Sequence, residues 1–512
     1  MRDRWLYRSS ADQPSPPRLA PIAALLVSCL LALSASADWR TQPVTTTVGE
    51  LEFRDCSLRN PVQRRLAQCA TLIVPENHEQ PQGRQIELFV ARLPARSPAR
   101  EPDPVLAIAG GPGQAASESF LHLDRMLPGL SRNRDIYLLD QRGTGGSNAQ
   151  HCDIDDAQAL MMEPDDEQWQ ELMQQCLQQF DGDPAHYSSS AAIHDIEHLR
   201  LALNVGQWNL FSVSYGTRVA QHYARQYSQA VRSSVLDSVL PPGMALGPNI
   251  APASQQALEN FLQRCRSDRA CAAAYPELDT GLRRLLNDLQ EAPVEVEIEH
   301  ADNLQRVTRL FTRTQLAGLL RLALYSPEQL SILPPMLHAA YAQDNFAPLT
   351  RSATHLLEQV GSGLAIGMHN AVVCTEDVPF FALDESVLEA NSASYLGDTI
   401  LRSLLASCEI WPAGTLDDNF HTPLQSDIPT LLLSGEHDPI TPPAYADQAM
   451  QGLSRSRHLV APGQGHSVSP HGCLPRLIAE FVDSTDPGAI DDSCLQRLRA
   501  APLFTDFHGP EP

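Results

Sequence analysis

The chain has 512 residues, of which 43% are hydrophobic, so it can bury more core than one ordinary domain holds. Its formal net charge of −24 repels nucleic acid and anionic membranes, and we expect no nucleic-acid partner. All 37 basic residues are arginine. The absence of lysine excludes Schiff-base and pyridoxal-lysine chemistry, Ser-Lys dyads and the lysine of a nucleotide-binding P-loop.

The N-terminal segment has the pattern of an export signal. Four arginines precede an apolar run over 19–33, and the small residues 35–37 form an A-x-A pattern. This predicts a signal peptide over 1–37 with cleavage before Asp38, and a periplasmic or secreted protein with no stable membrane insertion afterwards. The alternative is a lipid anchor at Cys29 in the lipobox-like LVSC. Because that cysteine lies inside the apolar run, ordinary cleavage is favoured.

The next part of the chain alternates short apolar runs with helical segments, which is typical of an α/β fold. The runs 71–75 and 86–93 predict an antiparallel hairpin. Further runs predict buried strands, each followed by a loop with glycine, serine or aspartate: 104–114, 134–147, 207–217 and 231–239. In an open parallel sheet, the edge formed by these loops is where sites form.

Residues 244–425 are mostly amphipathic helix, and strand signals resume at 428–443 and 456–467. A helical block between two halves of one sheet predicts an inserted cap. The sequence therefore predicts a core in two parts, 38–243 and 426–512, with the cap between them.

The cysteines other than Cys29 number ten and fall into neighbours along the sequence: 56 and 69, 152 and 176, 265 and 271, 374 and 408, 473 and 494. An even count in an exported chain predicts disulfides, although the sequence does not fix their connectivity. Paired CxxC motifs are absent, so no metal site is predicted.

The stretch FSVSYGTRVA places Ser214 between an apolar strand and a helix. Its spacing resembles the Gly-x-Ser-x-Gly nucleophile elbow, with Ser212 at the first glycine position. Asp438 in GEHDPITP and His466 in PGQGHS each follow a predicted strand. The order Ser, Asp, His is that of α/β-hydrolases, and predicts a nucleophile, an orienting acid and a base. Glu436 is an alternative acid, but Asp438 is better placed in the turn.

The glycine-rich stretch AGGPGQ, residues 109–114, also follows a predicted strand. Glycines let the backbone approach a substrate oxygen closely. We predict that the backbone N–H groups of Gly111 and Tyr215 form an oxyanion hole.

A dinucleotide-binding fold is an alternative for the same stretch. Gly111, Gly113 and Ala116 satisfy G-x-G-x-x-A after a strand, and Asp140 ends a later one. Two observations count against this alternative: Pro112 lies inside the loop, and the chain is predicted to be exported. A dinucleotide-binding fold also gives Ser214, Asp438 and His466 no role.

Together GGPGQ, DQRGTGGS, SVSYGT, GEHDPITP and GQGHS resemble the prolyl aminopeptidase and tripeptidyl aminopeptidase (TAP-like) branch of the α/β-hydrolases. The resemblance runs from CATLIVPENHEQPQGR to Cys473 and Cys494, which are similar to the cysteine pair that follows the catalytic histidine in the tripeptidyl type. Ala109 stands where the family has histidine, and Ser212 where it has glycine. Neither departure removes a triad residue or a backbone donor.

The resemblance implies an α/β-hydrolase fold with a helical cap. It also implies a serine exopeptidase that acts through an acyl-enzyme, without metal or organic cofactor, on peptides with a free N-terminus, releasing proline or short peptides. The segment NAVVCTEDVPF is similar to a cap segment of the family in which an acid follows a cysteine. Glu376, and after it Asp377, would bind the substrate ammonium group, and Asp140 and Arg142 of DQRG would brace the oxyanion loop. The alternative for both acids is a solvated surface position.

Two other functions stay open at this point. A carboxylesterase or lipase would use the same triad without an acid for the ammonium group. A binding protein without catalysis could share the fold, although the complete triad argues against it.

Overall fold

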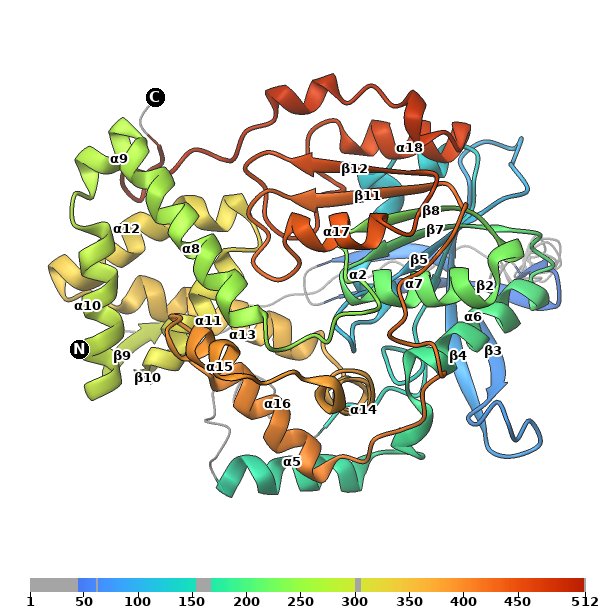
Figure 1. Ribbon diagram of the computed structural model, residues 1–512, viewed down its shortest axis with the longest axis horizontal. Coiled ribbons are helices and arrows are strands. Elements are labelled where there is room, and N and C mark those ends of the chain that lie inside the picture. Colours follow the sequence, from blue (N-terminus) through green and yellow to red (C-terminus); the bar gives the residue numbers. More distant parts are fainter. Residues whose placement is uncertain (1–44, 61–62, 153–166, 300–304, 511–512) are drawn as a thin grey trace, which may run out of the picture. The chain divides into compact units, whose positions relative to one another are not determined.

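The computed structural model describes residues 45–60, 63–152, 167–299 and 305–510 (Figure 1). The predicted signal peptide 1–37 and Cys29 lie outside the described residues.

A sheet of ten strands forms the centre of the fold, in the order β1-β2-β3-β4-β6-β5-β7-β8-β11-β12. Its strands are β1 (Thr45–Val48), β2 (Leu51–Arg59), β3 (Arg64–Pro75), β4 (Gln85–Leu93), β5 (Val105–Ile108), β6 (Ile136–Leu139), β7 (Trp208–Val213), β8 (Val231–Asp237), β11 (Thr430–Gly435) and β12 (Ser456–Ala461). From β1 to β6 neighbouring strands are antiparallel, and from β6 to β12 they are parallel.

The sheet confirms the strands predicted from the apolar runs. The predicted hairpin is β3 with β4, in which Leu72 faces Leu88. The parallel strands β5 and β6 are buried along their whole length, as expected for strands covered on both faces. The sequence analysis missed β1, which is a short run of threonines ending in valine, and β2, which carries charged side chains at exposed positions.

Helices cover both faces of the sheet. The helices outside the cap segment are α2 (Ala116–Ser119), α3 (Leu123–Met126), α5 (Glu167–Gln179), α6 (Ser189–Ala202), α7 (Tyr215–Gln226), α17 (Pro443–Met450) and α18 (Leu474–Ser484). One hydrophobic cluster joins the sheet to α6, α7 and α17, and another joins it to α2, α3 and α18. Short 3₁₀ turns are η1 (Leu130–Arg132), η2 (Pro184–His186), η3 (Ser228–Ala230), η4 (Val378–Phe380), η5 (Pro487–Ala489) and η6 (Ser493–Arg497).

Between β8 and β11 the chain forms a block of helices that lies beside the sheet in Figure 1. These are α8 (Ile250–Ser267), α9 (Arg269–Ala274), α10 (Leu278–Glu291), α11 (Arg313–Ala323), α12 (Pro327–Gln343), α13 (Ala347–Ser362), α14 (Ile366–Glu376), α15 (Glu385–Ser392) and α16 (Thr399–Ile410). An antiparallel pair that the sequence analysis did not predict, β9 (Val294–Glu299) with β10 (Arg306–Phe311), joins them.

The cap segment has a core of its own but is also anchored to the sheet. Side chains such as Phe261, Leu320 and Leu337 pack in a separate cluster, whereas Met368 and Val372 of α14 pack into the cluster under the sheet. Helix α14 is therefore the part of the cap segment that is fixed most directly to the core.

The structure confirms disulfides between sequence neighbours. The pairs are Cys56–Cys69, Cys152–Cys176, Cys265–Cys271, Cys374–Cys408 and Cys473–Cys494. Two of them lie in one hydrophobic cluster around Trp411, where α5, α14 and α16 meet. That cluster ties the helix before the cap segment to the cap itself.

Candidate active site

Ser214 occupies a sharp turn between β7 and α7. Its φ of 56° and ψ of −128° are rare for a residue other than glycine and fit a strained nucleophile elbow. The turn is crowded, since a Cβ at Gly216 would lie 2.4 Å from the carbonyl oxygen of Ala109. Ser212 is accommodated because its buried hydroxyl donates to the Val235 carbonyl at 3.1 Å. A serine in the first glycine position therefore leaves the elbow intact.

Asp438 and His466 are joined by a close hydrogen-bonded ion pair. The His466 Nδ1 lies 2.8 Å from the Asp438 Oδ2, and the Thr441 backbone N–H holds the same carboxylate at 2.8 Å. Burial lowers the pKa of His466, but the Asp438 charge and hydrogen bond outweigh it, so the net pKa is raised. Glu436, the alternative acid, accepts the Gly463 N–H instead and is exposed. The geometry favours Asp438 as the orienting acid.

Asp237, at the end of β8, connects the elbow to the histidine loop. Its carbonyl accepts the Ser214 N–H at 2.9 Å, and its carboxylate accepts the N–H groups of Val468 at 2.9 Å and Ser469 at 2.8 Å. No hydrogen bond joins the Ser214 hydroxyl to His466 within the described part of the chain, and such bonds are often long in unliganded enzymes. Asp237 is a positioning residue that the sequence analysis missed.

The glycine-rich loop lies against the elbow. A Cβ at Gly110 would be 3.1 Å from the Ser214 Cβ, and Gly111 has a φ of 107° that favours glycine. Tyr215 is the first residue of α7, so its N–H has no acceptor inside the helix. The loop of Gly111 and the N–H of Tyr215 thus border Ser214, as an oxyanion hole requires. The Pro112 carbonyl is held by the His369 ring at 3.1 Å.

Asp140 of DQRG connects the start of α2 to the turn after the motif. It is fully buried and accepts the backbone and hydroxyl groups of Ser117 at 2.8 and 2.9 Å, and the Gly146 N–H at 3.0 Å. Burial raises its pKa to about 6. The helix after the G-x-G-x-x-A stretch has only four residues, and Asp140 is occupied. The dinucleotide-binding alternative therefore has no support here.

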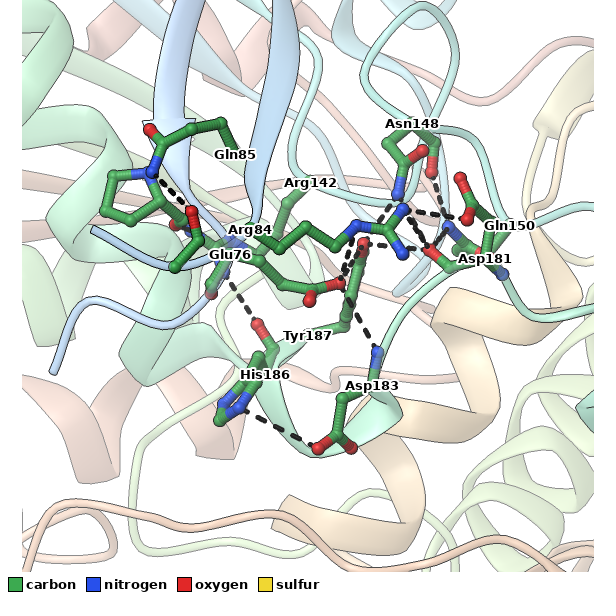
Figure 2. Close-up of polar contacts among 12 residues, drawn as sticks. Glu76, Arg84, Gln85, Arg142, Asn148, Gln150, Asp181, Asp183, His186 and Tyr187 are labelled. Atoms are coloured by element: carbon green, nitrogen blue, oxygen red, sulfur yellow. Dashed lines mark hydrogen bonds and ion pairs between the residues drawn. The ribbon is translucent and has the colours of Figure 1, made fainter. Parts of the chain in front are cut away.

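Arg142 of the same motif ties three segments together. Its guanidinium forms a two-bond pair with the buried Asp195 of α6, at 2.6 and 2.7 Å. It also donates to the carbonyls of Glu76 at 2.6 Å and His186 at 2.8 Å, and Figure 2 shows it among the polar side chains that join the end of β3 to the turn η2. Arg142 thus braces the end of β3 against η2 and α6, and these contacts do not involve the glycine-rich loop.

Glu376 and Asp377 at the end of α14 are fully buried, so a solvated surface position is wrong for both. Glu376 accepts the backbone N–H of Ser189 at 2.6 Å and its hydroxyl at 2.9 Å. The Arg218 guanidinium lies 3.4 Å from Glu376 and 2.8 Å from Asp377. The Ser189 hydroxyl also bonds the Tyr215 hydroxyl at 2.7 Å. The acids are thus linked to the residue that follows Ser214.

This acidic cluster, Glu376 and Asp377 with Arg218 and Ser189, carries more negative than positive charge when both acids are ionised. Burial raises the pKa of Glu376 to about 7, although Arg218 lowers it, and Asp377 raises it further. One carboxylate oxygen of Asp377 is buried without a hydrogen-bond partner among the described residues. Among the described residues, the single arginine therefore leaves one carboxylate oxygen of the cluster unpaired. The arginine one helical turn after Ser214 was visible in SYGTR, whereas no sequence signal pointed to Ser189.

Two kinds of feature are absent from the part of the chain that the structure describes. No group of three or more His, Cys, Asp or Glu side chains there is arranged to hold a metal ion. No helix there is both long and apolar enough to span a membrane.

Several known proteins are similar to this chain in sequence. Serine protease Hip1 of Mycobacterium tuberculosis is 24% identical over 505 residues, which cover 91% of this chain and 94% of that protein. Tripeptidyl aminopeptidase of Streptomyces lividans is 25% identical over 214 residues, 38% of each chain. Among solved structures, the proline iminopeptidase of Mycobacterium smegmatis is 12% identical with a TM-score of 0.37, covering 82% of this chain and 99% of that one. That structural similarity is too low to support an argument about function.

The sequence also matches a protein family over most of its length. Residues 103–471, which include the elbow, the glycine-rich loop, the acidic cluster and the Asp438–His466 pair, match the family described as alpha/beta hydrolase fold. The protein is a serine hydrolase that belongs to the α/β-hydrolase fold family.

Proposed function

We propose that this serine hydrolase is an exported exopeptidase that removes proline or short peptides from free peptide N-termini. Ser214 attacks the scissile carbonyl, and His466 takes its proton and gives it to the leaving amine, while Asp438 orients the imidazole. The N–H groups of Gly111 and Tyr215 stabilise the oxyanion. Water then hydrolyses the acyl-enzyme, with His466 as the base.

The acidic cluster is the observation that carries the proposal. An aminopeptidase must hold a substrate ammonium group at a fixed distance from its nucleophile. Glu376 and Asp377 share a single arginine, and Ser189 links Glu376 to Tyr215, which follows the nucleophile. A substrate ammonium would supply the positive charge that the cluster lacks, through charge-assisted hydrogen bonds. An esterase acting on neutral acyl groups has no need of such a group.

Export rests on two kinds of observation. The sequence predicts a signal peptide over 1–37, and five disulfides are present in the described residues. Disulfides persist in oxidising compartments, so they support a periplasmic or secreted enzyme acting on extracytoplasmic peptides.

The test compares prolyl, alanyl and tripeptidyl anilides with free and acetylated N-termini. We expect the free substrates to be cleaved at least tenfold faster in kcat/KM, because acetylation removes the charge that the acidic cluster would bind. Ser214→Ala should lower kcat by about 10⁴-fold or more. The matched control is Ser212→Ala, which removes a neighbouring buried hydroxyl and should keep most of the activity.

The outcomes separate mechanism from specificity. Equal cleavage of acetylated peptides or simple esters would refute the aminopeptidase proposal and favour a carboxylesterase or lipase with the same triad. Full activity in Ser214→Ala would refute the triad itself.

A further inference from the structure

The cap segment places a guanidinium beside the proposed catalytic base. Arg321 lies on α11, and its guanidinium carbon is 5.9 Å from the centre of the Tyr325 ring. The centre of the Tyr325 ring is in turn 5.0 Å from that of the His466 ring. The backbone carbonyl of Tyr325 also accepts the His466 backbone N–H at 2.9 Å. Arg321 is therefore separated from the base by one aromatic ring.

Arg321 is partly buried and, unlike the fully buried arginines, pairs with no acid among the described residues. The fully buried guanidinium groups of Arg92, Arg142 and Arg218 all pair with carboxylates. Among the residues that the structure describes, Arg321 forms no ion pair, and its buried Nε has no hydrogen-bond partner. Within the described part of the chain, its polar contact is a long one, 3.4 Å from Nη2 to the Tyr325 hydroxyl. A guanidinium in this setting can still bind an anion with two parallel hydrogen bonds.

The charge of Arg321 reaches both sides of the proposed site. Like burial, it opposes the net rise in the pKa of His466. It also contributes to the lowered pKa of His369. His369 holds the glycine-rich loop through the Pro112 carbonyl. The guanidinium is therefore within electrostatic range of both the base and the residue that holds that loop.

The position of Arg321 indicates which part of the substrate it meets. In the proposed mechanism, the base gives its proton to the leaving amine, so groups next to His466 flank the leaving part. The acyl part carries the ammonium group toward Glu376 and Asp377, which pack with Arg218 of α7. The two ends of the substrate thus meet opposite charges.

We infer that Arg321 is a specificity-determining residue that binds a carboxylate on the leaving part of the substrate. This inference rests on the proposed peptidase function and adds to it a preference for the group after the cut. The carboxylate can be an acidic side chain directly after the cut or the C-terminal carboxylate of a short peptide. Both offer the planar pair of oxygens that a guanidinium matches.

The experiment uses two pairs of peptides that share one acyl part. The first pair has Asp or Asn directly after the cut, in peptides with an amidated C-terminus. The second pair ends in glycine directly after the cut, as the free acid or the amide. We expect the carboxylate member of at least one pair to have a kcat/KM about tenfold higher, mainly through KM, and that pair identifies the source of the carboxylate.

Variants on α11 test whether Arg321 causes the preference. Arg321→Gln should bring the ratio within the preferred pair to about one, and Arg321→Lys should keep part of it because the charge remains. The matched control is Arg313→Gln on the same helix, whose guanidinium donates to the Tyr395 carbonyl at 2.9 Å, and it should keep the wild-type ratio. Thermal unfolding of each variant checks that the cap stays folded.

Two results would overturn the inference. One is a ratio near one for both pairs in the wild-type protein. The other is an Arg321→Gln variant that loses activity equally on both members of a pair, which would show a purely structural contact with Tyr325. Anilides have a neutral leaving group, so free versus acetylated anilides test the proposed peptidase function separately.

Discussion

Ser189 donates two hydrogen bonds to the carboxylate of Glu376, at 2.6 Å from its backbone N–H and 2.9 Å from its hydroxyl. Burial nevertheless raises the pKa of Glu376 to about 7. The side chain is therefore mostly neutral at pH 5.5 and mostly charged at pH 8. If it binds the substrate ammonium, the advantage of free over acetylated substrates should grow as the pH rises through 7.

This prediction is checked by the ratio of kcat/KM for free and acetylated tripeptidyl anilides between about pH 5.5 and 7.0, where most of the substrate amine is charged. His466 acts on both substrates, so its own titration cancels in the ratio. Glu376→Gln should give a low ratio that no longer changes with pH. A wild-type ratio that is flat or falls with pH would contradict a role for Glu376.

Replacing Asp438 should separate it from its neighbour Glu436. In Asp438→Asn the imidazole loses the carboxylate that holds it at 2.8 Å, and kcat should fall by about 10⁴-fold. Glu436→Gln removes the negative charge beside the Gly463 N–H and the His437 ring but keeps an acceptor oxygen, and it should leave kcat within a few-fold of wild type. Steady-state kinetics on one anilide measures both. A larger loss in Glu436→Gln would reverse the assignment of the acid.

Asp237→Asn should reveal its part in positioning the base. An amide has one oxygen where the carboxylate accepts two N–H groups, so the His466 loop loses a hydrogen bond and kcat should fall about 10- to 100-fold. The Asp237 charge also raises the pKa of His466. The acid limb of the plot of kcat/KM against pH reports the pKa of the base in the free enzyme. In Asp237→Asn this limb should therefore move to lower pH.

The control for Asp237 is Asp140→Asn, another fully buried acid that accepts backbone N–H groups, at Ser117 and Gly146. The Asp140 charge is not among the causes of the His466 pKa shift. The acid limb of the Asp140→Asn profile should therefore stay in place even though this variant is destabilised. Identical profiles for both variants would reduce Asp237 to a structural role.

The triad and the parallel strands could be predicted because their signals are local. Ser214, Asp438 and His466 each follow an apolar run, and the carboxyl ends of parallel strands meet at one edge of the sheet. The order of the three residues then led to the triad prediction without any knowledge of contacts. The alternation of β2, by contrast, is interrupted by charged residues, and so it gave no clear strand signal.

The residues that complete the site were missed because their partners are distant in the sequence. Ser189 and Glu376 are 187 positions apart, and nothing near Ser189 distinguishes it from the serines beside it. Arg321 lies in an apolar helical stretch, where one arginine is typical of a solvated position. Only packing shows that it lacks an acid and lies beside the base.

The disulfide Cys374–Cys408 should stabilise the protein more than Cys265–Cys271. The first closes a loop of 34 residues and the second one of 6, and the entropy of loop closure predicts about 4 against about 2 kcal/mol. Replacing both cysteines of a pair by serine, followed by urea unfolding, measures the difference. Because Cys374 lies on α14 two residues before Glu376, its loss should also lower kcat/KM for free N-termini more than for acetylated ones. The Cys265–Cys271 variant, whose disulfide joins α8 to α9, should keep that ratio, and a greater loss there would contradict the anchoring role of α14.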